Sequence, residues 1–195
     1  MVSDKDKSIL LVGVGGQGSI LASKIFCEVA FKSGYDVKKS ELHGLARRGG
    51  AVHSHIRFGE KVWSPLVRRK ETDLIVAFEE LEALRWVAYA RPGGHFVVNS
   101  MQIVPSIASS GMVEYPSDPI KTLKSCGVKP LVIDATSAAL KSGSLVFLSM
   151  VMLGYISNLL EFSVSVWEEV AMESVPKFKE KNWDAFLKGK KLKKR

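Results

Sequence analysis

Cysteine is scarce in this chain of 195 residues, which contains only Cys27 and Cys126. Two cysteines are too few to ligate an iron–sulfur cluster, and neither has a partner at a metal-binding spacing. Cys27 falls within a helical pattern and Cys126 within a Ser-Cys-Gly turn, so we expect both to be free thiols. Free thiols are typical of a reducing compartment, and charged residues rather than a secretory signal precede the first apolar run. We therefore expect a cytoplasmic protein.

Histidine is also scarce, with four residues in the chain. His53 and His55 are two positions apart, which would allow them to chelate a metal from one strand face, but no third ligand accompanies them. We interpret both as solvent-facing strand histidines and predict no metal site. The acidic residues Glu79, Glu80 and Glu82 are interpreted as the start of a helix, where negative charge suits the helix dipole. The sequence alone therefore shows no catalytic set.

Acidic residues are few at the C-terminal end, where residues 177–195 carry nine basic and two acidic side chains. The formal net charge of the chain is +8, so almost all of the excess lies in this segment. A lysine-rich end of this kind is typical of a solvated tail rather than of a basic binding face. We predict one folded domain over residues 1–176, a basic tail over residues 177–195, and no binding of nucleic acid.

Glycine is concentrated in one turn, where Gly13, Gly15, Gly16 and Gly18 follow an apolar run and precede a helical pattern. The spacing Gly-x-Gly-x-x-Gly lets the chain turn sharply, lets a ligand approach the backbone and lets the helix pack against the strand. The first N–H groups of the helix would attract a phosphate or a carboxylate. We include the neighbouring Gln17 in this candidate site. The alternative is a turn that only allows the strand and the helix to pack.

A second loop follows the next expected strand and carries His43, Arg47, Arg48, Gly49 and Gly50. Arginine suits phosphate or carboxylate through its planar set of donors. If this loop lies beside the glycine turn, both would face one crevice outside the carboxyl ends of the strands. The alternative is a surface turn with two solvated arginines. Glu41 precedes this loop, so a dinucleotide bound at its ribose is conceivable, but the missing second crossover helix disfavours it.

The pattern of apolar residues predicts a three-layer, Rossmann-like α/β domain whose sheet is mostly parallel with one β-hairpin. The uncharged stretch 142–160 is interrupted by Gly, Ser and Asn, which favours a buried helix over a membrane span. We expect Leu81, Leu84 and Ala88 to face the core from a helix over 79–90. The expected strands cover 9–14, 35–40, 51–58, 62–66, 74–78, 95–99 and 131–134, with 51–58 and 62–66 forming the hairpin. The other expected helices cover 17–33, 117–126, 144–160, 164–175 and 182–188.

Six motifs stand in a fixed order along the chain: Gly13-Val14-Gly15-Gly16-Gln17-Gly18, Ser40-Glu41-Leu42-His43-Gly44-Leu45-Ala46-Arg47-Arg48-Gly49-Gly50, Val52-His53-Ser54-His55-Ile56-Arg57, Ala77-Phe78-Glu79, Arg91-Pro92-Gly93-Gly94 and Asp134-Ala135-Thr136. In this combination and order they resemble the gamma-type subunit of 2-oxoacid:ferredoxin oxidoreductases and, within that family, the beta subunit of the indolepyruvate enzyme. The resemblance runs from about residue 8 to residue 160. Two positions depart from the usual loop His-Gly-Met-Ala-Gln-Arg-Gly-Gly, because Leu45 replaces the methionine and Arg47 the glutamine.

The resemblance implies a small subunit of a complex that decarboxylates a 2-oxo acid, passes electrons to ferredoxin and transfers the acyl group to coenzyme A. Thiamine diphosphate and [4Fe-4S] clusters would sit on a large partner subunit, so this chain would be inactive alone, and it could pair with itself when isolated. Its own contribution would be to complete the complex and to hold coenzyme A phosphates at Gly13 to Gly18 and Arg47 to Gly50. The rival functions are a free-standing NAD(P)- or flavin-dependent oxidoreductase and a binding module without a catalytic role.

Overall fold

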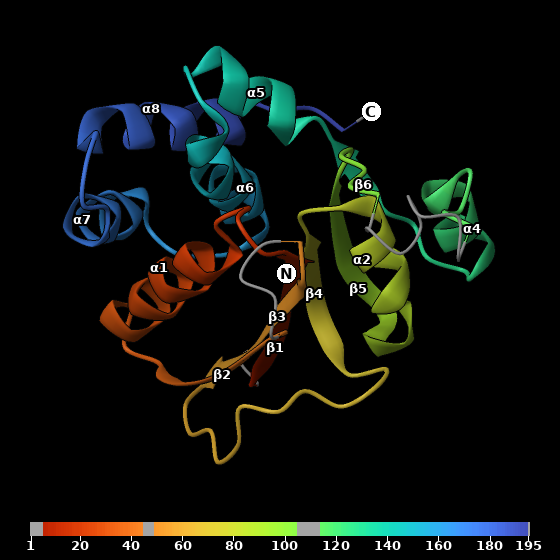
Figure 1. Cartoon of the computed structure of the whole chain (residues 1–195). Coiled ribbons are helices and arrows are strands. Elements are labelled where there is room, and N and C mark those ends of the chain that lie inside the picture. The colour runs from red at the N-terminus through yellow and green to blue at the C-terminus, as the bar shows by residue number, and fades with distance from the viewer. Residues whose placement is uncertain (1–5, 45–48, 105–113, 195) are drawn as a thin grey trace.

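The computed structural model describes residues 6–44, 49–104 and 114–194 (Figure 1). Within these ranges, the strands are β1 (Lys7–Val14), β2 (Asp36–His43), β3 (Ala51–Gly59), β4 (Thr72–Ala77), β5 (Ala90–Asn99) and β6 (Leu131–Ile133). The helices are α1 (Ser19–Lys32), α2 (Glu80–Arg85), α4 (Pro119–Ser125), α5 (Ala135–Lys141), α6 (Leu148–Ile156), α7 (Val164–Ser174) and α8 (Lys179–Lys190), with 3-10 turns η1 (Val87–Tyr89), η2 (Leu145–Phe147) and η3 (Ser157–Leu159).

The six strands form one sheet in the order β2-β3-β1-β4-β5-β6. The pairs β1–β4, β4–β5 and β5–β6 are parallel. Strand β3 is antiparallel to both of its neighbours, β1 and β2. Five strands therefore run in one direction and β3 in the other. Figure 1 shows α1, α6, α7 and α8 on one side of the sheet and α2 and α4 on the other. The predicted three-layer α/β domain with a mostly parallel sheet is confirmed.

The predicted hairpin is present, but with a different partner strand. We expected residues 51–58 to pair with residues 62–66, whereas β3 pairs with β2, with Leu42 opposite His53. The other edge of β3 pairs with β1, with Gly13 opposite Val52. Because both edges of β3 are occupied, residues 62–66 find no free edge and run as a loop. Val62 is buried in that loop, so its apolar character reflects burial rather than strand pairing.

The structure also corrects the prediction that residues 177–195 form a solvated tail. Most of this segment is helix α8, which buries Trp183 and Phe186 in the core and packs along α6. The approach is close, because a Cβ on Gly154 of α6 would lie 2.0 Å from the carbonyl oxygen of Phe186. A Cβ on Gly189 of α8 would lie 2.1 Å from the carbonyl oxygen of Val151. The basic side chains occupy the outer face of an amphipathic helix, so this end of the chain is part of the domain.

Every residue of α6 is buried, which confirms the interpretation of the uncharged stretch as a core helix. Among the described parts of the chain, no helix combines the length and the apolar character needed to cross a membrane.

Candidate functional site

The glycine turn lies where the sheet changes its direction of connection. Strand β1 leads into α1 on one face, and its neighbour β4 leads into α2 on the other face. In open α/β sheets such a switch point leaves a crevice outside the carboxyl ends of the strands, and ligands bind there. Gly13 to Gly18 therefore occupy the position in the fold that the sequence predicted for a ligand site.

The spacing of the glycines has a separate cause at each position. Gly16 has a φ of 104° and Gly18 a φ of 79°, a left-handed conformation that glycine adopts without strain. A Cβ on Gly13 would lie 2.9 Å from the Cβ of Phe78, so a side chain there would collide with the segment that follows β4. A Cβ on Gly18 would lie 3.2 Å from the Ser149 side chain of α6. The turn thus needs glycine both for its backbone conformation and for packing.

The N-terminus of α1 has the electrostatic character of an anion site. Gly18 is its N-cap residue and contributes no side-chain hydrogen bond, and no acidic residue lies in the first turn of this described helix. Gly16 is exposed and Gly15 half-buried in front of it. The helix dipole and the first N–H groups therefore favour an anion at this point.

The structure places the described ends of the second loop at the same edge. The N–H of Gly15 donates to the carbonyl oxygen of Gly50 over 2.8 Å, so the loop and the glycine turn are in direct contact. Gly49 has a φ of 76°. His43 is exposed at the end of β2, which is separated from β1 by β3. Arg47 and Arg48, which would supply the cationic part of the predicted site, lie outside the described residues.

Gln17 was included in the predicted ligand site, but its side chain is buried and bonded within the protein. Its Oε1 accepts the N–H of Val14 over 2.7 Å, and its Nε2 donates to the carbonyl oxygen of Phe78 over 3.1 Å. Nε2 also lies 3.5 Å from the Sδ of Met101. Gln17 therefore acts as a positioning residue that ties the glycine turn to the end of β4.

A polar pair that the sequence analysis did not single out continues this connection across the sheet. Asn99, at the end of β5 and fully buried, donates through Nδ2 to the carbonyl oxygen of Phe78 over 3.1 Å. The same Nδ2 donates to Thr136 Oγ1 over 2.9 Å, and Asn99 Oδ1 accepts the N–H of Thr136. The ends of β1, β4, β5 and the start of α5 are thus linked. The available signal was a polar residue at the last position of a strand whose immediately preceding residues are apolar.

The three acidic residues at the start of α2 are buried rather than solvated. Glu79 caps the helix by accepting the N–H of Glu82 over 2.9 Å, as its interpretation as a helix start requires. Its other carboxylate oxygen accepts the N–H of Ile103 over 3.0 Å and the hydroxyl of Tyr115 over 2.8 Å. Burial, followed by the hydrogen bond to Glu79, raises the pKa of Tyr115. Glu80 accepts a hydrogen bond from Gln102 Nε2 over 2.8 Å.

Within this cluster, the pKa of the Glu82 carboxyl group is strongly raised. Burial raises its pKa to about 7, against an opposing effect of Arg85, whose Nε lies 3.2 Å from Glu82 Oε1. Among the described residues, Glu82 Oε2 has no hydrogen-bond partner. The expected inward face of this helix, Leu81, Leu84 and Ala88, is wrong, because Glu80, Glu82 and Ala83 are the buried positions. The N-terminal hydrogen bonds rotate the acidic residues inward and leave the leucines half-buried.

The histidine pair, which the sequence predicted to face solvent, is instead packed against aromatic rings. His55 is buried, and its Nδ1 accepts the N–H of Val67 over 3.1 Å. The His53 ring lies 4.4 Å from that of Trp86, and burial lowers the pKa of both histidines. Among the described residues, no cluster of three potential ligands could hold a metal ion.

The geometry around Glu41 disfavours the NAD(P) alternative. Its carboxylate accepts hydrogen bonds from Ser23 and from Lys39, the latter over 2.9 Å. Burial alone would raise the pKa of Glu41, but these hydrogen bonds outweigh it and hold the pKa below its usual value. In addition, β3 separates the strand of Glu41 from β1, whereas a dinucleotide fold places these strands side by side. Glu41 is therefore engaged within the protein and is not positioned for a ribose.

Comparison with known proteins agrees with this architecture. The chain is 34% identical over 191 residues to "Indolepyruvate oxidoreductase subunit IorB" of Thermococcus kodakarensis, with 95% of each chain covered. A solved structure, the gamma subunit of a keto/oxoacid ferredoxin oxidoreductase from Geobacter sulfurreducens, superposes with a TM-score of 0.68 at 23% identity, covering 94% of this chain and 95% of that one.

A second solved structure, 2-oxoglutarate:ferredoxin oxidoreductase from Magnetococcus marinus, gives a TM-score of 0.73 at 22% identity. It covers 96% of this chain but only 31% of the longer chain. The profile of the family described as pyruvate ferredoxin/flavodoxin oxidoreductase matches residues 8–192, which include α8. With nearly the whole length matched by the family and by a curated relative, the chain belongs to the pyruvate ferredoxin/flavodoxin oxidoreductase family.

Proposed function

We propose that this chain is the small subunit of a complex that oxidatively decarboxylates an arylpyruvate, such as indolepyruvate, to an acyl-CoA with ferredoxin as electron acceptor. The observation that carries the proposal is the 34% identity to an indolepyruvate oxidoreductase subunit over 95% of both chains. The Magnetococcus structure supports the subunit role, because there the same fold makes up 31% of a longer oxidoreductase chain. A domain that is one part of a larger chain in one protein can be a separate subunit in another.

The residues of this chain favour a division of labour with a partner subunit. Burial raises the pKa of Cys27 to about 12, and Cys126 is exposed beyond α4 on the other side of the sheet, so the two thiols form no cluster-binding set. The chemistry of decarboxylation and electron transfer would be supplied by thiamine diphosphate and [4Fe-4S] clusters on a large partner subunit. This chain would complete the complex at the carboxyl edge of its sheet.

Reconstitution tests the complex. The purified chain should give no arylpyruvate-dependent reduction of ferredoxin, and addition of the separately purified large subunit should restore it. Indolepyruvate, pyruvate and 2-oxoglutarate compared at equal concentration would identify the substrate class. Turnover by the chain alone, or a large subunit that is fully active without it, would contradict the proposal.

We further propose that coenzyme A phosphates bind between the glycine turn and the second loop. Gly15, Gly16 and Gly18 would present backbone N–H groups at the N-terminus of α1, and Arg47 and Arg48 would add charged donors. His43, Gly49 and Gly50 would shape the same loop. The support is the 2.8 Å hydrogen bond between Gly15 and Gly50, which holds the two segments together, and the helix N-terminus without a side-chain cap.

The arginine pair provides the sharpest test of the coenzyme A site. Charged hydrogen bonds contribute about 1.5–3 kcal/mol each, more than the roughly 0.3–1 kcal/mol of a helix dipole. Arg47→Ala with Arg48→Ala should therefore raise the KM of the assembled complex for coenzyme A by at least about tenfold. The matched control is Arg68→Ala with Arg69→Ala, an adjacent pair of arginines that is exposed and lies outside the proposed site.

Size-exclusion chromatography of the variant complexes separates binding from assembly. An arginine variant that assembles and keeps the KM for coenzyme A of the wild type would defeat the site assignment. A variant that fails to assemble, while its control assembles, would show instead that the arginines pair with acidic groups of the partner subunit.

A further inference from the structure

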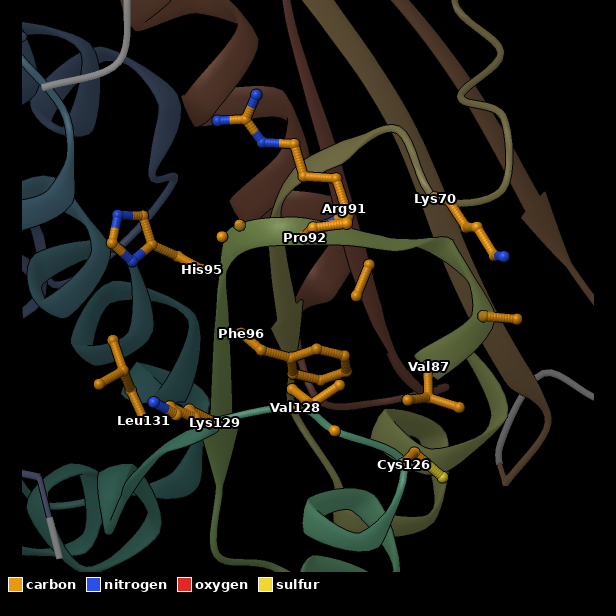
Figure 2. A pocket seen from close by; sticks show the side chains of 15 residues that line it. Lys70, Val87, Arg91, Pro92, His95, Phe96, Cys126, Val128, Lys129 and Leu131 are labelled. Carbon is orange, nitrogen blue, oxygen red and sulfur yellow. The ribbon is translucent and has the colours of Figure 1, made fainter.

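A hollow of about 760 Å³ lies at the end of the sheet opposite the glycine turn, beside the amino ends of β4, β5 and β6 (Figure 2). Irregular pairing between β4 and β5 creates one of its walls. Thr72 pairs with Ala90 and Leu74 pairs with His95, so the four residues 91–94 of β5 stand opposite one residue of β4. These residues form one wall of the hollow, and residues 126–129 together with Leu131 at the start of β6 form the facing wall.

The backbone around the hollow is held in unusual conformations. Lys70, Gly93 and Gly127 all line it, with φ values of 62°, 76° and 83°. A left-handed conformation is unfavourable for a lysine, which unlike glycine has a Cβ. A hydrogen bond of 3.1 Å from the N–H of Lys70 to the carbonyl oxygen of Ala88 holds this residue in place. Backbone strain of this kind clusters at functional sites.

The side chains combine an apolar floor with a cationic rim. Phe96, Val128 and Val87 lie in the middle of the view in Figure 2, and basic side chains lie around them. The basic residues are Lys70, Arg91, His95 and Lys129, and no acidic residue is among the described residues that line the hollow.

The basic residues differ in how far they are already paired. Arg91 Nη1 lies 3.0 Å from Asp73 Oδ1, so its charge is partly compensated. Lys70 and Lys129 are exposed, and no carboxylate of the described chain lies within ion-pair distance of them. These two lysines are therefore available to an incoming anion.

We propose that this hollow is a binding site for a small anionic ligand with an apolar body, a carboxylate or phosphate carried on an aromatic or aliphatic group. Its volume is within the range of small-molecule pockets, which are about 300–1,000 Å³, apolar in lining and equipped with few polar groups. The floor would receive the apolar body, and either Lys70 or Lys129, which lie on opposite sides of the hollow in Figure 2, would reach the anion from its own side. The site is separate from the glycine turn, which lies at the carboxyl edge of the sheet, so it stands or falls independently of the proposed function.

A fluorescent probe with this chemistry tests the proposal on the full chain. The probe is 8-anilino-1-naphthalenesulfonate, and N-phenyl-1-naphthylamine is its neutral counterpart. The sulfonate should bind at least about tenfold more tightly than the neutral probe. Lys70→Ala with Lys129→Ala should weaken it by at least about tenfold, and Ala88→Trp, which fills the hollow from an exposed position, should abolish binding. The charge-matched control, Lys24→Ala with Lys179→Ala, removes two exposed lysines elsewhere.

Each other outcome would overturn the proposal. Equal binding of the neutral probe would show a purely apolar patch, and unchanged affinity in the Lys70/Lys129 and Ala88 variants would place the probe elsewhere. Weakened binding in the Arg47/Arg48 variant would place it at the glycine turn. Loss of binding when the large subunit is added would show that the hollow is a surface covered by the partner protein. Circular dichroism spectra identical to those of the wild type would confirm that the variants are folded.

Discussion

The two faces of the sheet are covered very differently. The face that carries α1, α5, α6, α7 and α8 has a continuous apolar core with interlocking aromatic rings, including Phe26, Trp167 and Phe186. The face that carries α2 and α4 has a smaller apolar cluster, and next to it lie the buried Glu79, Glu82 and His55. The first face supplies most of the apolar burial, and the second holds the buried acidic cluster and lies beside the hollow. The apolar burial that contributes most to stability and the buried carboxyl groups of the acidic cluster thus lie on opposite faces of the sheet.

The largest expected effect on stability comes from a substitution in the thicker layer, which is formed by α1, α5, α6, α7 and α8. Gly154→Leu should lower the free energy of unfolding by about 3 kcal/mol or more, because its side chain would collide with the backbone of α8 at Phe186. Urea denaturation followed by circular dichroism would measure this. Glu168→Leu, on the exposed face of α7, is the control and should change stability little. A Gly154 variant as stable as the wild type would show that α8 contributes little to the domain, as the predicted tail would have.

An intermediate effect on stability is expected at Glu82, on the face of the sheet that carries α2 and α4. Its pKa is raised from the ordinary 4.5 to about 7. Between these two pH values, the folded state therefore holds a proton that the unfolded state has released. This contribution to stability is complete below about pH 4.5 and is lost as the pH rises towards and through 7. Glu82→Gln should therefore raise the free energy of unfolding by roughly 1–3 kcal/mol at pH 8 and by much less at pH 5.

Thermal and urea unfolding at both pH values would test the Glu82 prediction. Glu168→Gln, at an exposed position, should leave the pH dependence of stability unaltered. If the Glu82 variant and the wild type keep the same pH dependence, Glu82 does not retain its proton in the folded protein.

The smallest effect concerns the thiols, one on each side of the sheet. Burial raises the pKa of Cys27 to about 12 within α1, whereas Cys126 is exposed after α4. Because the thiolate is the reactive form, a disulfide reagent at pH 8 should label the exposed Cys126 rapidly. The same reagent should label Cys27 only when the protein unfolds. Cys126→Ser should remove the rapid phase without changing stability. Rapid labelling of both thiols would show that the thicker layer opens readily.

The features that the sequence predicted depend on local patterns. The apolar run of β1, the glycines after it and the run of β4 specify a strand, a turn and a buried strand within a few residues of each other. The burial of α6 also followed from its composition, because it contains no charged residue. For such segments, the identity of the packing partner does not change the result.

The features that were missed depend on partners distant in sequence. The alternation in β3 predicted a strand correctly, but its pairing with β1 and β2 depends on which sheet edges are free. The apolar residues of α8 are spaced among lysines, so only its packing against Gly154 reveals a core helix. The acidic residues of α2 face inward because Ile103 and Tyr115 satisfy Glu79. None of these partners can be read from the local sequence.

The position of β1 has a consequence for the order of folding. It is synthesised before the other five described strands, yet its two neighbours in the sheet are β3 and β4. A chain emerging from the ribosome can form α1 early, but β1 cannot gain both partners until residue 77 has been made. Until then a strand that is apolar on both sides is exposed, the situation in which nascent chains aggregate or recruit chaperones. The central strand of this domain is therefore its most vulnerable segment during synthesis and its most enclosed segment afterwards.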